Sequence, residues 1–202
     1  MGAARLPLAC RVASYRPFEE LALPHMAAQG LRGAELHAPP SGQAAGLRRR
    51  LGELGLRAVT VQAACDLSSP QALAEFTGQL PTVAELGARH VLIAGRCEAD
   101  DLDTARRRLG ELAEASAAAG VTLLLETHPP LATNAAVTLE TFAQVPQAAL
   151  RLNFDPANIV FYNEGLDALA ELRRVLDLVG GVHLKDSDGG YRQRSFPALG
   201  EG

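Results

Sequence analysis

Three residues of types that bind metal ions follow apolar segments in the second half of the chain. Glu126 ends the segment VTLLLE, Asp155 ends LRLNFD, and His183 follows LVGGV. Asp155 lies 29 residues after Glu126 and His183 lies 28 residues after Asp155, each close to the roughly 31 residues of one β/α unit. Carboxylate and imidazole groups together suit Mn²⁺, Mg²⁺, Co²⁺ or Zn²⁺. The pattern therefore predicts a divalent-metal site where three neighbouring strands end.

Any one of these residues taken alone would more often cap a strand end or form a salt bridge. Three of them at the same place in successive units favour a common site instead. His128 lies two residues after Glu126, so it would face the same side if the strand continued. There it could bind a substrate hydroxyl or hold Glu126, or it could be an ordinary loop histidine.

Other polar residues are placed where they could contact a substrate. Glu35 and His37 end another apolar segment and point to the same side. Lys185 lies two residues after His183, so it would face the same side if the strand continued. Arg192 and Arg194 lie in the loop beyond it. These cations could meet hydroxyl groups or a phosphate, although a solvated surface is the simpler explanation for the loop arginines.

The elements that must position these residues alternate regularly. Short apolar segments are separated by longer amphipathic ones, which is typical of parallel strands joined by crossover helices. Glycines follow several of the helices, as expected of helix-ending residues. The predicted strands cover residues 8–14, 33–37, 58–63, 90–95, 121–128, 150–155 and 179–185, and the helices cover 18–29, 47–54, 70–86, 102–118, 138–145 and 165–178.

Parallel strands buried on both faces occur in doubly wound sheets and in TIM barrels. A doubly wound nucleotide fold needs a glycine-rich turn after its first strand, but this chain has Ser-Tyr-Arg-Pro at 14–17. We therefore predict an α/β protein with a (β/α)8 TIM barrel in one domain over residues 1–202. Eight units need about 250 residues, so about seven strands are expected and the eighth β/α unit is expected to be missing.

Composition excludes several classes of function. The net charge is −4 and no Lys/Arg block is present, so a nucleic-acid partner is not expected. No apolar segment is long enough for a membrane span, and the apolar run near the N-terminus is too short for a signal peptide. The three cysteines are widely separated and form no disulfide or zinc-ribbon pattern, which suits a cytoplasmic protein.

The motifs LLLETH, LNFDPANIVFYNEG, VHLKDSDGG and FPALGEG resemble the sugar phosphate isomerase/epimerase family of xylose-isomerase-like barrels. The likeness covers essentially the whole chain and is clearest from Val121 onward. It implies that Glu126, Asp155 and His183 are metal ligands, with a fourth ligand, a Glu, after the eighth strand. That Glu has no counterpart here, because Glu201 lies in the loop before the eighth strand. Asn158 stands where some relatives have a His that touches substrate or a further metal.

The resemblance implies a divalent-metal isomerase or epimerase that works through a metal-bound enediolate of a sugar or sugar phosphate. Glu126 would be one acid/base residue and the eighth-strand Glu the other, so a chain without that Glu is expected to lose most of its activity. A homo-oligomer is possible. Three alternatives stay open: a dehydratase of a polyol or dehydroshikimate-like acid, a truncated barrel without turnover, and an endonuclease IV-like enzyme. The last is disfavoured because its extra histidines are missing: Gln62 ends the third strand and Ala94 and Gly95 the fourth.

Overall fold

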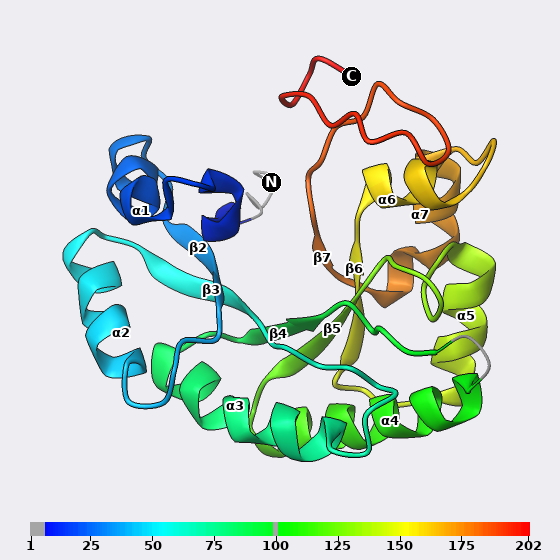
Figure 1. The fold of residues 1–202 in the computed structure, drawn as a ribbon, viewed down its shortest axis with the longest axis horizontal. Coiled ribbons are helices and arrows are strands. Elements are labelled where there is room, and N and C mark those ends of the chain that lie inside the picture. Colours follow the sequence, from blue (N-terminus) through cyan, green and yellow to red (C-terminus); the bar gives the residue numbers. More distant parts are fainter. Residues whose placement is uncertain (1–6, 99–100) are drawn as a thin grey trace, which may run out of the picture.

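The computed structural model describes residues 7–98 and 101–202 and contains one parallel sheet. Its seven strands lie in sequence order, so each strand pairs with the next along the chain. Figure 1 shows that the sheet is curled, with α2 to α5 along its outer side. The strands are β1 (Ala9–Arg11), β2 (Gly33–His37), β3 (Arg57–Gln62), β4 (His90–Ile93), β5 (Thr122–Glu126), β6 (Leu150–Phe154) and β7 (Val179–Val182).

The helices follow the predicted alternation. The α-helices are α1 (Glu19–Ala28), α2 (Ala44–Glu53), α3 (Ala72–Leu86), α4 (Leu102–Ala118), α5 (Ala135–Gln144), α6 (Pro156–Tyr162) and α7 (Ala168–Val175), and the short 3-10 helices are η1 (Val12–Tyr15) and η2 (Leu176–Leu178). The sequence pattern did not predict α6, which is only 7 residues long. Its signal was local: Asp155 caps the helix and Pro156 occupies the first turn, both favourable there.

Most strands end earlier than predicted because the chain turns as soon as it reaches the polar ends of the sheet. The first strand was predicted to extend to residue 14, but β1 ends at Arg11 and continues as η1. Glycines end the helices as expected: Gly30, Gly87 and Gly120 have φ of 76°, 75° and 71°, a conformation that costs glycine little.

The core lies on both faces of the sheet. In β4 and β5, Val91, Leu92, Leu123 and Leu124 are at most 2% exposed, although successive side chains point to opposite faces. One face packs against the helices and the other fills the inside of the curl. Burial on both faces explains why these strands read as continuous apolar runs rather than as alternating ones.

The sheet does not close into a ring within residues 7–98 and 101–202, because β1 and β7 do not pair with each other. Apolar side chains near these edges are exposed: Leu8 by 61%, Val182 by 47% and Leu184 by 65%. The predicted fold is thus confirmed as an incomplete (β/α)8 barrel with seven strands.

The three cysteines are unpaired, and none of the described helices could cross a membrane. Residues 1–6, which bear on the signal-peptide expectation, lie outside the described residues.

Candidate metal centre

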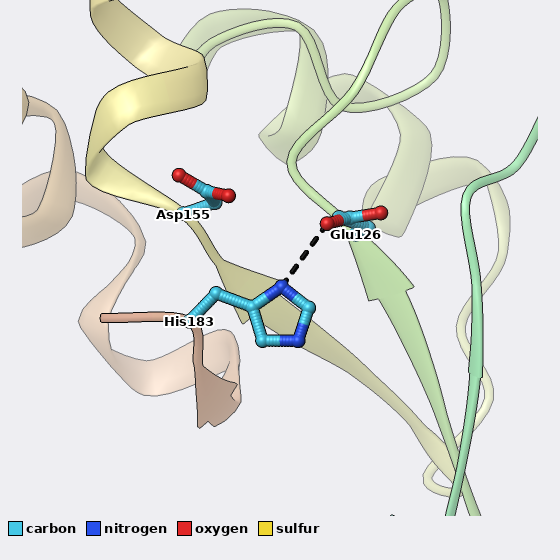
Figure 2. Close-up of side chains that lie close together, drawn as sticks. All are labelled: Glu126, Asp155 and His183. Carbon is cyan, nitrogen blue, oxygen red and sulfur yellow. Dashed lines mark hydrogen bonds and ion pairs between the residues drawn. The ribbon is translucent and has the colours of Figure 1, made fainter. Parts of the chain in front are cut away.

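The structure brings Glu126, Asp155 and His183 together at the carboxyl ends of three adjacent strands (Figure 2). Glu126 is the last residue of β5, Asp155 directly follows β6, and His183 directly follows β7. The backbone N–H of His183 donates to the carbonyl of Phe154 at 2.9 Å, which continues the sheet to the level of the site. Parallel pairing therefore sets all three side chains at one height.

One atom from each of these three residues can serve as a metal ligand. The three atoms lie within 4.8 Å of one another, close to the span of a single ion with bonds of about 2.1 Å. Two oxygens and one nitrogen form a donor set suited to a divalent cation and leave positions open for a substrate. The residues present thus fit a divalent metal, although three protein ligands do not select one metal over another.

His183 lies between two carboxylates. Its Nδ1 is 3.1 Å from Oε1 of Glu126 and its Nε2 is 3.1 Å from Oε2 of Glu35. Burial opposes the charge on the ring, but the hydrogen bonds and charges of the two glutamates outweigh it and raise the pKa of His183 to about 10. Burial also opposes ionisation of Glu126, yet His183, with Arg11 and His128, holds the pKa of Glu126 below its ordinary value. Glu126 is therefore a carboxylate at neutral pH.

Asp155 is held by its own helix and by a neighbouring strand. Its Oδ1 accepts a hydrogen bond from the backbone N–H of Asn158, and its own N–H donates to Oγ1 of Thr127. The Nζ of Lys185 lies 3.8 Å from Oδ2 of Asp155. Burial raises the pKa of Asp155, and the Asn158 and Lys185 contacts only partly offset it. The carboxylate is thus available to a cation but incompletely neutralised without one.

The structure places Asn158 and Lys185 beside the site, but with protein partners. The side-chain amide of Asn158 donates to the Thr127 carbonyl at 2.9 Å and accepts from Nζ of Lys185 at 3.0 Å. The Lys185 ammonium also lies 3.9 Å from the centre of the Phe196 ring. Asn158 therefore supports Asp155 in this structure, and the predicted substrate contacts of both residues stay predictions.

The other predicted pocket residues are more scattered. His128 contacts the Pro129 carbonyl through Nδ1 and the Tyr162 hydroxyl through Nε2, not Glu126. His37 and Arg192 are exposed, and the Arg192 guanidinium stacks over the Tyr191 ring at 4.9 Å. The structure does not bring these three into contact with the ligand triad.

Sequence reasoning missed Arg11. This residue ends β1 and places its Nε 3.6 Å from Oε1 of Glu35. Its Nη2 donates to Oε1 of Gln62 at 2.6 Å. A single arginine at the end of a three-residue strand carries no pattern of its own, so only its partners reveal its place beside the site.

Comparison with known proteins identifies the family. The family model described as xylose isomerase-like TIM barrel matches residues 23–202, so the chain belongs to that family. The resemblance seen in the motifs is thereby confirmed. No curated protein matches the sequence at a significant level.

Solved structures share this fold at low sequence identity. A xylose isomerase domain protein from Planctomyces limnophilus has a TM-score of 0.79 at 19% identity, covering 99% of this chain and 83% of that chain. D-psicose 3-epimerase from Clostridium cellulolyticum H10, with D-tagatose, has a TM-score of 0.76 at 17% identity over 93% and 77%. The probable 3-DHS dehydratase AsbF from Bacillus anthracis has a TM-score of 0.75 at 16% identity over 91% and 74%. At these identities the similarity establishes the fold alone.

Proposed function

We propose that this chain carries the metal site of a divalent-metal-dependent sugar isomerase or epimerase. The observation that carries the proposal is the convergence of Glu126, Asp155 and His183 at the carboxyl ends of adjacent strands, where TIM-barrel enzymes have their active sites. The similarity in fold to D-psicose 3-epimerase supports the same class of substrate, a ketose.

The chain's own residues have definite tasks in this chemistry. A bound divalent cation would supply Lewis acidity toward a carbonyl and a neighbouring hydroxyl of the sugar. Glu126, ionised at neutral pH, accepts the proton from the carbon next to the carbonyl and leaves an enediolate. A second acid, which the resemblance assigns to a Glu after the eighth strand, would return a proton to the other face and invert that carbon, whereas return of a proton to the neighbouring carbon would isomerise the sugar. Lys185, whose Nζ lies 3.8 Å from Asp155, would bind a hydroxyl or phosphate of the same substrate.

The first prediction concerns metal binding. Asp155→Ala should abolish tight Mn²⁺ binding, measured by isothermal titration calorimetry, because it removes one of three charged or polar ligands. Asp103→Ala is the matched control, since this aspartate is 97% exposed on α4. Equal Mn²⁺ affinity of the wild type and Asp155→Ala would count against the site.

A second reaction is supported by the similarity to a probable 3-DHS dehydratase. The same donor set could serve an elimination, with Glu126 again taking a proton next to a carbonyl. Incubating the metal-loaded protein in D₂O with ketoses, ketose phosphates and 3-dehydroshikimate separates the two. Deuterium on the sugar carbon indicates isomerase or epimerase chemistry, and an aromatic product from 3-dehydroshikimate indicates the dehydratase. Metal binding without turnover on any of these would instead support a non-catalytic barrel.

A further inference from the structure

Glu35 contacts the metal-site histidine from the side opposite Glu126. It lies in β2 with its side chain 9% exposed, and its Oε2 is 3.1 Å from Nε2 of His183. Figure 2 shows the Nδ1 atom of the ring directed at Glu126 and the other ring nitrogen directed away from both carboxylates of the triad. Glu35 meets that second nitrogen. The imidazole is therefore held at both nitrogens, although only one of them faces the other metal ligands.

We propose that Glu35 is a positioning residue that orients His183 for metal binding and does not itself touch the substrate. The inference rests on the proposed metal site. An imidazole binds a cation through a lone pair, so the nitrogen on the Glu126 side must be free of its proton, which then resides on Nε2. A carboxylate that accepts a hydrogen bond from Nε2 selects this tautomer and fixes the rotation of the ring.

Glu35 is itself held in place from two further strands. Its Oε1 lies 3.6 Å from Nε of Arg11, and both atoms are buried without a hydrogen-bond partner among the described residues. The buried Glu35 carboxylate needs a positive charge nearby, and Arg11 supplies it although the Arg11 side chain as a whole is 39% exposed. Arg11 is in turn bonded to Gln62 on β3 at 2.6 Å. The contacts thus run from β3 through β1 and β2 to the histidine that follows β7.

This arrangement distinguishes a positioning role from the substrate contact predicted for Glu35. One of its carboxylate oxygens faces His183 and the other faces Arg11. Glu35 is only 7% exposed and its Oε1 is buried, so little of the carboxylate is open to a substrate hydroxyl. His37, predicted to share the pocket, is exposed instead.

Calorimetric titration of the 202-residue chain with Mn²⁺ tests the proposal. Glu35→Ala should weaken binding 10- to 100-fold, the usual effect of removing a partner of a metal-bound histidine. Glu35→Gln should lose roughly tenfold, because the amide oxygen can still accept from Nε2 but carries no charge. Glu171→Gln is the matched control: Glu171 is 4% exposed and is bonded to Arg174 and to the backbone N–H of Ala135 rather than to any of the three ligand residues, so this change should leave Mn²⁺ affinity unchanged.

A second measurement follows the ring itself. In the Zn²⁺-loaded protein, ¹⁵N-edited NMR of His183 should show a protected Nε2–H in the wild type and in Glu35→Gln, and exchange with water should remove it in Glu35→Ala. If thermal melting shows that Glu35→Ala does not fold, Glu35→Gln decides the question. Wild-type affinity in the folded Glu35 variants overturns the inference and leaves the metal site standing. Failure of the wild type to bind Mn²⁺ overturns both the inference and the proposed function.

Discussion

At the scale of single residues, the metal-free site is organised by His183. Glu126 and Glu35 both approach its ring at 3.1 Å, so without a cation a protonated imidazole joins the two carboxylates. Burial opposes this charge, but the two partners outweigh burial and raise the pKa of His183 from 6.5 to about 10. A proton and a metal ion therefore compete for the same nitrogen.

The stability of the metal-free protein should depend on pH through this histidine. Because its folded-state pKa is raised, His183 contributes stability that is fully present below pH 6.5 and is lost as the pH rises through about 10. Urea denaturation in EDTA should show the wild type more stable than His183→Gln at pH 6, with the difference shrinking toward pH 10. A difference that stays constant from pH 6 to 10 would show that the protonated ring is not what stabilises the site.

At the scale of elements, β7 positions His183 and has little freedom to move. A Cβ added at Gly180 would lie 2.6 Å from Cβ of Arg151 on β6 and 3.1 Å from Cδ2 of Leu124 on β5. The Arg151 Cβ is fixed to its backbone, so β7 would have to shift. The absence of a side chain at Gly180 thus allows the close approach that brings His183 to the level of the other ligands.

Gly180→Ala should therefore lower the free energy of unfolding by about 1–3 kcal/mol, as overpacking does, and weaken Mn²⁺ binding. Gly46→Ala on α2 is the control, since nothing lies within 4 Å of its added Cβ. There a helical alanine should stabilise by about 0.5–1 kcal/mol and leave metal affinity unchanged. Chemical denaturation and calorimetry on both variants make the comparison. Wild-type stability and affinity in Gly180→Ala would show that β7 can shift without harm.

The segment that follows β7 is tied back by one aspartate. Oδ2 of Asp186 accepts from the backbone N–H of Gly200 at 2.7 Å and of Gly202 at 3.3 Å, and Oδ1 accepts from that of Ser187 at 3.0 Å. These hydrogen bonds lower the pKa of Asp186. The carboxylate therefore holds residues 200–202 near the strand end that carries His183.

Asp186→Ala should speed hydrogen exchange at Gly200 and Gly202, because their backbone N–H groups lose an acceptor. Mass spectrometry of deuterium uptake measures this change, and the exposed neighbour Asp188 provides the control as Asp188→Ala. Since the pKa of Asp186 is lowered, protection in the wild type should fall as the pH drops through that pKa, after correction for intrinsic exchange. Equal deuterium uptake in Asp186→Ala and Asp188→Ala would show that Asp186 does not hold residues 200–202 in place.

At the scale of the whole molecule, the sheet has two free edges. Within the described residues β1 and β7 are not paired with each other, and apolar side chains such as Leu184 remain exposed near the gap. Unpaired edges expose backbone groups that can pair with other chains. The Glu35 contact to His183 joins the two ends of the curl through side chains instead.

Adding an in-frame eighth β/α unit that ends its strand in Glu should raise both the melting temperature and the turnover of ketoses. The added strand would pair with β1 and β7, and the Glu would supply a fourth ligand and a second acid/base group. The same unit with Gln in place of that Glu is the control: it should keep the gain in stability and lose the gain in activity. If the 202-residue chain is already as stable and as active as the extended one, the expectation drawn from the open barrel is wrong.

The sequence by itself determined the order of the strands and helices. It also determined that Glu126, Asp155 and His183 lie at the same height, at the carboxyl ends of their strands. These features are local: apolar runs, helix-ending glycines such as Gly87, and the nearly constant spacing of Glu126, Asp155 and His183. In a parallel sheet that spacing repeats one structural unit, so equal spacing means equal height. The short helix α6 was missed because its pattern is brief, although the capping Asp155 marks its start.

Only the tertiary structure decided which residues surround the ligands. Glu35 and His183 are 148 residues apart, and nothing in either local segment indicates that they meet. Glu35 reaches His183 because the sheet curls until β2 faces the end of β7 (Figure 1), and Arg11 contacts Glu35 from β1. That curl accumulates from small rotations between successive strands. A contact between β2 and the end of β7 therefore depends on the rotation at every strand between the two. No local sequence pattern encodes the sum of those rotations.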